Sequence, residues 1–260
     1  MERRGFFVSM GAIAVAGAGF APVRATSPSN TRLLLLHTND THSRIEPFPD
    51  GPHKGLGGIA RRATLVREQR ALGFPTLLVD AGDVFQGTPY FNLWKGKLDY
   101  KLMSQVGYDC VTLGNHDFDN GVDGLVAAMS EATFPFVNCN YEFSGAPALA
   151  AKVRPYWIKA FPGLKVGVTG VGPAFDGLVD PKNHLGVVDH DPLASLKPVL
   201  HQLREVEGCH AILILSHLGI DRERALAPLV QEADVIVGGH SHTFMKAPEI
   251  IGNVLLNQVG

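Results

Sequence analysis

Short apolar runs alternate along the chain with longer stretches in which apolar residues recur at helical spacing. The apolar runs predict strands at residues 33–37, 76–79, 110–113, 136–138, 156–160, 165–170, 211–216, 235–237 and 253–256. The longer stretches predict helices at residues 59–72, 99–106, 122–131, 192–206 and 222–231, several of them followed by Gly or Pro. Strands that alternate with helices in this way are typical of a layered α/β domain.

The composition is that of an ordinary globular protein. The 260 residues include 45% apolar and 18% charged residues, and the formal net charge is −2. Residues 141–155 form an irregular stretch that is too short to divide two domains, so we expect one domain over residues 31–260. No cluster of Lys and Arg with aromatic residues follows the N-terminus, which argues against a nucleic-acid polymer as partner and favours a small substrate.

The N-terminus has the pattern of a twin-arginine export signal over residues 1–25. Arg3 and Arg4 precede an apolar, Gly- and Ala-rich run from Val8 to Ala21, and small residues follow that run. The run is shorter than the roughly 20 apolar residues that cross a bilayer. We therefore expect a periplasmic or extracellular protein without a stable membrane anchor.

The chain has an odd number of cysteines, Cys110, Cys139 and Cys209, each beside or within a predicted strand. A disulfide framework or a catalytic thiol would fit this pattern less well than small buried apolar side chains. We therefore place no cysteine in a functional site.

The first two predicted strands are followed by residues that commonly bind metals. Asp40 and His42 stand two apart after the first strand, and a carboxylate and an imidazole at that spacing can converge on one ion. Asp83 comes after Gly82 at the end of the second strand, where the glycine permits a sharp turn. Each pattern alone would also suit a hydrogen-bonded residue at the start of a loop.

Three later strands end in the same way. The strand at residues 110–113 is followed by Asn115, His116, Asp117 and Asp119, a density of polar groups that is hard to explain as surface decoration. His217 follows the strand at residues 211–216, and His240 and His242 follow the strand at residues 235–237. Ligands in open α/β sheets gather outside the carboxyl ends of strands, so we expect these side chains to meet.

The mixture of imidazoles, carboxylates and one amide, without a thiolate, favours divalent ions such as Mn, Zn, Fe or Co. One catalytic ion that keeps an open position cannot use so many protein ligands. A carboxylate that bridges two ions about 3.5–4 Å apart can use them all, so the set predicts two metal ions.

These motifs, in this order, resemble the calcineurin-like metallophosphoesterases, and within them the bacterial group of 5′-nucleotidases, UDP-sugar hydrolases and 2′,3′-cyclic phosphodiesterases. The resemblance runs from His37 to the C-terminus and rests on five motifs, which are D-x-H, G-D, G-N-H-D, an isolated strand-end His and G-H-S-H. It implies a four-layer α/β/β/α sandwich with two mixed sheets. It also implies an enzyme that uses metal-activated water to convert a nucleoside monophosphate into a nucleoside and phosphate.

The resemblance further implies a role for each matching residue. One metal would be held by Asp40, His42 and His242, and the other by Asn115, His217 and His240, with Asp83 as the bridge. His116 would be the catalytic imidazole and Asp119 its carboxylate partner. The remaining histidines, His37, His53, His184, His190, His201 and His210, match no motif position, and we expect them to be ordinary core or surface residues.

The sequence departs from the group in one respect, because the C-terminal substrate-binding domain of these nucleotidases has no counterpart in it. We expect either a C-terminally truncated catalytic domain or a stand-alone domain with a separate partner chain, and the unpaired sheet edge favours truncation. Two other functions fit the same motifs, namely a thiosulfohydrolase of the sulfur-oxidation type and an inactive metal-binding scaffold. A complete ligand set together with His116 and Asp119 argues against the scaffold.

Overall fold

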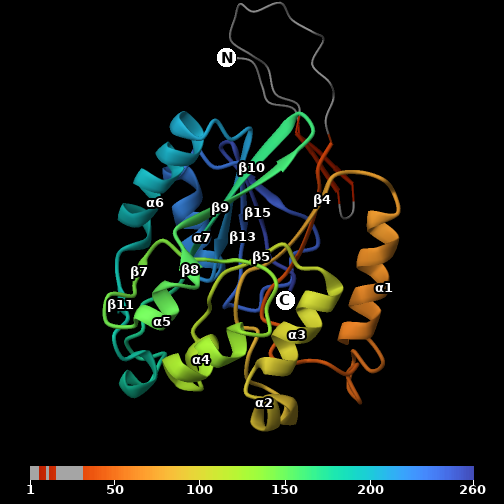
Figure 1. Ribbon diagram of the computed structural model, residues 1–260. Helices are drawn as coiled ribbons and strands as arrows, with labels where there is room; N and C mark the ends of the chain where they lie inside the picture. Colours follow the sequence, from red (N-terminus) through yellow and green to blue (C-terminus); the bar gives the residue numbers. More distant parts are fainter. Residues whose placement is uncertain (1–5, 10–11, 16–31) are drawn as a thin grey trace, which may run out of the picture.

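The computed structural model describes residues 6–9, 12–15 and 32–260 (Figure 1). Arg3, Arg4 and most of the predicted export signal lie outside these residues. Within the residues predicted to form that signal, β1 (Phe6–Ser9) and β2 (Ala12–Val15) pair antiparallel. In the described part of the chain no helix combines the length and the apolar character needed to span a bilayer.

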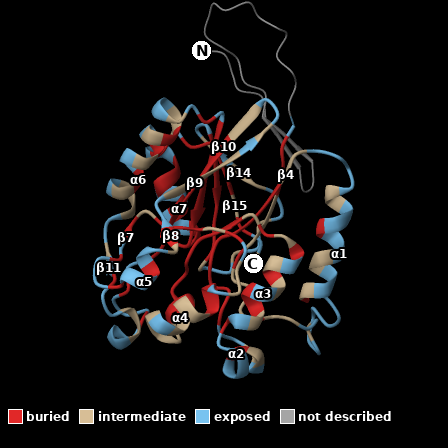
Figure 2. Ribbon diagram, viewed as in Figure 1, coloured by how far each residue is buried: buried red, intermediate tan, exposed pale blue. Residues whose placement is uncertain are grey.

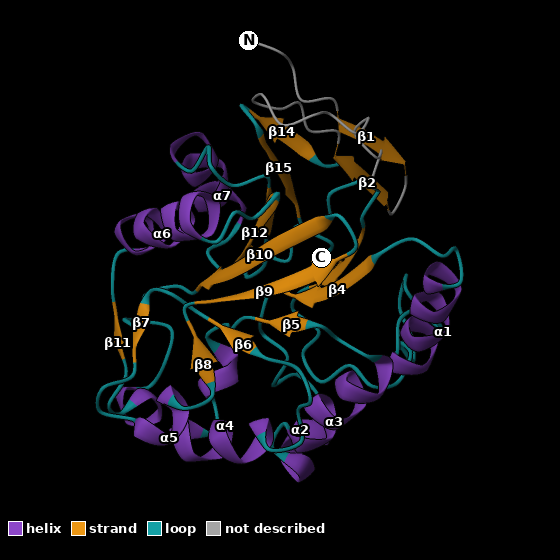
Figure 3. Cartoon of the chain, turned by 45° about the horizontal axis from the view of Figure 1, so that its top comes forward, coloured by secondary structure: helices purple, strands orange, loops and turns teal. Residues whose placement is uncertain are grey.

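One sheet has five strands in the order β3 (Leu34–Thr38), β4 (Thr76–Asp80), β5 (Cys110–Val111), β6 (Phe136–Val137) and β8 (Val153–Arg154). All its neighbouring strands are parallel. Its outer face is covered by helices, which Figure 3 shows along one side of the molecule. They are α1 (Ile59–Arg70), α2 (Pro89–Trp94), α3 (Lys97–Val106), α4 (Gly121–Met129) and α5 (Pro147–Ala150).

The second sheet has six strands in the order β14 (Glu249–Ile251), β15 (Val254–Asn257), β13 (Val235–Val237), β12 (Ala211–Ser216), β10 (Leu164–Val171) and β9 (Tyr156–Phe161). Its central pairs are parallel, and the edge strands β14 and β9 pair antiparallel with their neighbours. The helices α6 (Pro192–His201) and α7 (Ile220–Leu226) lie beside this sheet, apart from the other five (Figure 3).

Alternate residues of the central strands bury two different faces, as the geometry of a strand requires. Leu77 of β4 and Leu213 of β12 belong to one core cluster, which fills the space between the two sheets. Leu78 packs instead in the cluster that contains Met103 of α3, and Ile214 packs with Leu196 of α6. The buried strands in the middle of Figure 2 thus have helices outside both sheets.

The predicted four-layer α/β/β/α class is therefore confirmed. One detail differs, because only the six-stranded sheet is mixed and the five-stranded sheet is parallel throughout.

The three cysteines are free thiols, with Cys110 and Cys209 buried and Cys139 partly buried. This agrees with the expectation that they act as small apolar side chains.

Several predicted elements differ from the observed ones in length. The helix expected at residues 192–206 is α6 followed by a π-helical turn at Gln202–Val206. The helix expected at residues 222–231 is α7 followed by a 3₁₀ turn at Ala227–Leu229, which contains a proline. The stretch expected to be irregular contains α5, β8 and β7 (Tyr141–Glu142), and β7 pairs with β11 (Val188–Asp189). Such short elements contain too few residues for a periodic pattern.

Candidate metal centre

The predicted site residues all follow the carboxyl ends of strands in the two central sheets. Asp40 and His42 follow β3, Asp83 follows β4, and Asn115 follows β5 and precedes a 3₁₀ helix at His116–Phe118. His217 follows β12, and His240 and His242 follow β13. The side chains from both sheets meet at one end of the sandwich, where their ligand atoms form two groups.

The first group consists of Asp40, His42 and His242, whose ligand atoms all lie within 4.8 Å of one another. The Nε2 atoms of the two rings are 3.1 Å apart, and Asp40 Oδ1 lies 3.3 Å from His242 Nε2 and 3.9 Å from His42 Nε2. Three potential ligand atoms thus face one point, although His42 and His242 are 200 residues apart in sequence.

The second group consists of Asp83, His217 and His240, whose ligand atoms also lie within 4.8 Å of one another. His217 Nε2 is 3.0 Å from Asp83 Oδ2, and it is 3.8 Å from Asp40 Oδ1 of the first group. The two groups therefore adjoin. Asp40 contacts rings of both groups, and the bridging role of Asp83 stays a prediction.

Two buried polar atoms of this centre have no hydrogen-bond partner, Asn115 Oδ1 and His217 Nε2. Although His217 Nε2 is close to Asp83, the contact lacks hydrogen-bond geometry. Leaving a buried donor or acceptor unsatisfied costs about 1–3 kcal/mol, so a partner is expected for each. An amide oxygen and an imidazole nitrogen are ordinary ligands of divalent ions, so the residues present fit a metal pair.

The backbone at the candidate ligands is strained. Asp40, His42, Asp83, His240 and His242 all have φ between 45° and 75°, and they are five of the eight non-glycine residues with positive φ in the described chain. A non-glycine residue in this region costs on the order of 1–3 kcal/mol and persists only where its surroundings hold it there. Such strain is common at functional sites, and here it coincides with the predicted ligands.

Backbone carbonyls orient two of the rings. His42 Nδ1 lies 3.0 Å from the carbonyl oxygen of Phe85, and His217 Nδ1 lies 2.7 Å from that of Ala81. Because a carbonyl can only accept, Nδ1 carries the proton in each ring. This leaves Nε2 unprotonated in the neutral ring and available to a metal, the arrangement usual for metal-binding histidines.

The buried residues Asp83 and His217 favour each other's charged form. Burial by itself raises the pKa of Asp83, but the neighbouring His217 lowers it to about 2. Burial lowers the pKa of His217, yet the Asp83 and Asp40 carboxylates outweigh this and raise it. A positive charge is therefore favoured where these carboxylates meet.

Asp117 belongs to the site, although its position in the sequence predicts no particular role for it. Its carboxylate accepts hydrogen bonds from the backbone amides of Gly114, Asp83 and Val84 at 2.8, 3.1 and 3.1 Å. The Asp117 carboxylate thereby links the loop after β4, which contains Asp83 and Val84, to the loop after β5, which contains Gly114. Its place inside the G-N-H-D motif could have indicated that Asp117 belongs to the site. Only the structure shows that its carboxylate binds the backbone amides of two loops.

His116 and Asp119 are brought together at the edge of the centre. His116 Nδ1 lies 2.9 Å from Asp119 Oδ2, and this hydrogen bond raises the pKa of His116. The His116 ring is also in edge contact with the His42 ring, with centroids 5.4 Å apart. His116 is partly exposed, with 35% of its side chain accessible, so it can reach a molecule bound at the centre.

The histidines that match no motif lie in ordinary surroundings. His184, for example, stacks on Phe175, and His190 pairs with Glu142 at the surface. None of the six belongs to a candidate metal group within the described residues.

Comparison with known proteins agrees with this geometry. The family model described as calcineurin-like phosphoesterase matches residues 33–244. The 5′-nucleotidase of Bos taurus is 36% identical over 223 residues, which are 82% of this chain and 38% of that protein. The chain thus spans about two-fifths of the length of the curated relatives it matches.

Solved structures show the same fold. A 5′-nucleotidase precursor from Thermus thermophilus has a TM-score of 0.78 and 35% identity, covering 86% of this chain and 48% of that one. The Thermus thermophilus sulfate thiohydrolase SoxB has a TM-score of 0.76 at 18% identity, covering 89% of this chain and 52% of that one, a likeness of fold alone. With two groups of candidate metal ligands at its strand ends and a family match over most of its length, the chain belongs to the calcineurin-like phosphoesterase family.

Proposed function

We propose that this protein hydrolyses phosphate esters with two divalent metal ions, and that its substrates are nucleoside 5′-monophosphates. The observation that carries the proposal is the pair of adjoining ligand groups with the hydrogen-bonded His116 and Asp119 at their edge. The 5′-nucleotidases among its relatives support the choice of substrate.

Asp40, His42 and His242 would hold one ion, and Asn115, His217 and His240 the other, with Asp83 between them. When bound, the ions would activate water and neutralise charge on the phosphate oxygens. Mn, Zn, Fe and Co suit this donor set of nitrogen and oxygen atoms.

The chain's own contribution to the chemistry would come from His116. Asp119 holds its Nδ1, which fixes the ring and favours the imidazolium. The remaining proton on Nε2 would then stabilise or be donated to the ester oxygen that leaves with the nucleoside. Asp119 acts through His116 and is a positioning residue in this scheme.

We further propose that the protein is exported by the twin-arginine route. Arg3 and Arg4, followed by the apolar run from Val8 to Ala21, support this proposal. Cleavage of thiosulfonate esters is not favoured, because the likeness to the sulfate thiohydrolase is confined to the fold.

The test is a comparison of wild type with His116→Ala, both loaded with Mn²⁺ or Zn²⁺ and assayed on 5′-AMP, 4-nitrophenyl phosphate and a thiosulfonate ester. We expect phosphate release from 5′-AMP by wild type. His116→Ala should keep both metals and lose about 10²–10⁴-fold in turnover, the usual effect of removing an acid–base group.

The choice of ester separates two roles for His116. If the residue donates a proton, the loss should shrink for 4-nitrophenyl phosphate, whose leaving group needs no proton. Normal turnover of 5′-AMP by a fully loaded His116→Ala enzyme would show that His116 has no catalytic role. Absence of phosphate release by loaded wild type would refute the substrate assignment.

A further inference from the structure

The loop after β13 carries two candidate ligands at alternate positions. It runs from Gly239 to Thr243, and His240 and His242 are its even-numbered residues. Both have left-handed backbones, with φ of 75° and 50°, and His242 is exposed to solvent. A backbone of this kind persists only where its surroundings hold it, so contacts from elsewhere in the fold must fix this loop.

The side chain of Gln258 supplies these contacts. Gln258 directly follows β15 and is fully buried. Its Nε2 donates to the carbonyl oxygen of Gly239 at 2.9 Å. Its Oε1 accepts from Ser241 Oγ at 3.0 Å and from the backbone amide of Thr243 at 3.2 Å. The three odd-numbered residues of the loop are thus all bound to one amide group.

Glu223 of α7 holds the Gln258 amide in turn. Its carboxylate is also fully buried, and it accepts from Gln258 Nε2 at 2.7 Å and from the backbone amide of Gly239 at 3.3 Å. With this bond Gln258 uses both donors and both acceptor positions of its side chain. Turning the amide over would place its oxygen against the oxygens of Glu223 and Gly239, so the network fixes one orientation.

The network is closely packed and reaches two elements beside the loop. A Cβ on Gly238, which precedes the loop, would overlap Glu223 Oε2 and stand 2.7 Å from Gln258 Cγ. Ser241 Oγ also accepts from the backbone amide of Ile220, the first residue of α7, at 3.0 Å. The loop after β13 is therefore attached to both α7 and the end of β15.

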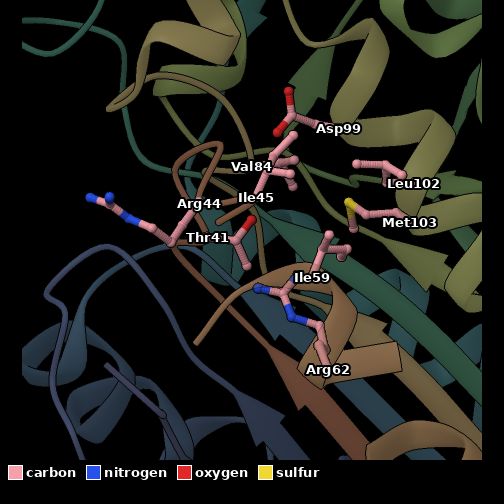
Figure 4. Close-up of a pocket in the computed structure, with 9 residues that line it drawn as sticks. All are labelled: Thr41, Arg44, Ile45, Ile59, Arg62, Val84, Asp99, Leu102 and Met103. Carbon is pink, nitrogen blue, oxygen red and sulfur yellow. The ribbon is translucent and has the colours of Figure 1, made fainter. Parts of the chain in front are cut away.

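The candidate ligands of the other sheet are held in a different way. The backbone amides of Asp40 and His42 donate to carbonyl oxygens of the loop after β4 at 2.9 and 3.1 Å. Figure 4 shows Thr41, which lies between them in sequence, lining a pocket together with Met103 of α3. A substitution of Gln258 should therefore disturb the ligands after β13 first.

We propose that Gln258 is a positioning residue for the metal centre and that Glu223 supports it. By binding the odd-numbered residues of the loop, the Gln258 amide directs the imidazole of His242 to one candidate metal group and that of His240 to the other. The inference rests on the proposed function, because it takes both histidines as metal ligands. It does not depend on which ester is the substrate.

Three variants test this role. Gln258→Met has a side chain of similar length that lacks the amide group. Ser241→Ala is milder, because it removes one of the four bonds to Gln258 at an exposed residue and should still fold. Glu223→Gln is the conservative variant, since it keeps an oxygen that can accept from Gln258 Nε2.

Asp234→Asn is the matched control. Asp234 is a buried carboxylate at the opposite end of β13, where it accepts from the backbone amide of Ile212 at 2.9 Å and from Arg204 Nη2 at 2.6 Å. Replacing it should lower stability in urea unfolding as other buried polar substitutions do. It should leave the loop that carries the ligands unchanged.

The readouts separate positioning from general stability. Hydrogen exchange of the Thr243 amide in the metal-free protein reports on the loop itself. Competition with a fluorescent chelator gives the Kd for Mn²⁺. The visible absorption of the Co²⁺-loaded protein reports on the coordination of the ions, which a loss of stability alone would not change.

We expect Gln258→Met to speed exchange of the Thr243 amide, to weaken Mn²⁺ binding about 10-fold or more and to alter the Co²⁺ spectrum. Ser241→Ala should change the same readouts in the same direction by less. Glu223→Gln should also lose less than Gln258→Met, because the bond to Gln258 is retained. Asp234→Asn should match wild type in all three readouts.

Wild-type exchange, Kd and Co²⁺ spectrum in Gln258→Met would overturn the inference, and so would wild-type values in Ser241→Ala if Gln258→Met does not fold. Equal losses of Mn²⁺ affinity in Gln258→Met and Asp234→Asn would also overturn it, because the loss would then follow from stability alone. No readout uses a substrate, so a failure to release phosphate from 5′-AMP would count against the proposed function and not against this role of Gln258.

Discussion

Gly114 lies so close to Asp83 that a single methyl group should disturb the metal centre. A Cβ on Gly114 would stand 2.2 Å from Asp83 Oδ1 and 2.6 Å from the Asp83 amide nitrogen. A Cβ atom essentially never lies within 3.0 Å of another heavy atom, so the Asp83 carboxylate must move by about 0.8 Å, the difference between 3.0 and 2.2 Å. The Gly114→Ala variant is therefore a test of the ligand role of Asp83.

The expected magnitudes follow from this displacement. Forcing an extra carbon into a packed site typically costs about 1–3 kcal/mol of stability. Replacing glycine at an ordinary φ offsets some 0.4–1 kcal/mol of that by restricting the unfolded chain. A misplacement near 1 Å at a catalytic group can cost about 10²-fold in rate, so kcat/KM should fall on that scale together with metal content.

Gly167→Ala in β10 is the control. Its Cβ would stand 2.8 Å from Leu203 Cδ2 and 3.1 Å from Cys209 Sγ, in the core beside α6 and away from the candidate ligands. Both variants should lose stability in urea unfolding, but only Gly114→Ala should lose metal by elemental analysis and activity on 5′-AMP. Full metal content and wild-type kcat/KM in Gly114→Ala would refute the assignment of Asp83 as a ligand.

Three further predictions concern the bridge, export and acid stability. Asp83→Asn should lower the occupancy of both metals, whereas His42→Ala should chiefly empty one; equal single-ion losses on elemental analysis would contradict the bridge. Replacing Arg3 and Arg4 with Lys should keep the protein in the cytoplasm, and unchanged delivery to the periplasm on fractionation would contradict the twin-arginine route. Burial lowers the pKa of His37 to about 4, so its neutral ring should stabilise the fold above pH 6.5, and up to about 3 kcal/mol of that stability should be lost as pH falls toward 4. His37→Gln should reduce this loss in urea unfolding at pH 7.5 and 5, and an identical pH dependence in both proteins would count against the assignment.

The positions of the main strands follow from the sequence alone. Residues 211–216 and 235–237 are predicted as strands and observed as β12 and β13 with the same bounds. Such runs are recognisable because a strand buried on both faces is apolar at every position. Short elements such as α2 and β14 escape this reasoning, because their few residues show no period and are fixed by contacts with neighbours.

The sequence also predicts which residues form the site. Each candidate residue comes shortly after a strand, and ligands bind at the carboxyl ends of strands in α/β sheets. The separation of these residues into two groups follows from the family resemblance and not from the residues by themselves. Asp40 meets His242 and Asp83 meets His217 only because two sheets pack face to face, and no local pattern encodes that pairing.

Tertiary structure alone also decides the geometry that makes these side chains usable. The left-handed backbone at His42 and Asp83 is unfavourable in an isolated peptide and persists because surrounding contacts hold it. Asp117 shows how, since its one buried carboxylate accepts hydrogen bonds from amides of two loops that are about 30 residues apart in sequence. The sequence determined which strands form and what chemistry follows them, whereas long-range packing decided which of those groups meet and at what angle.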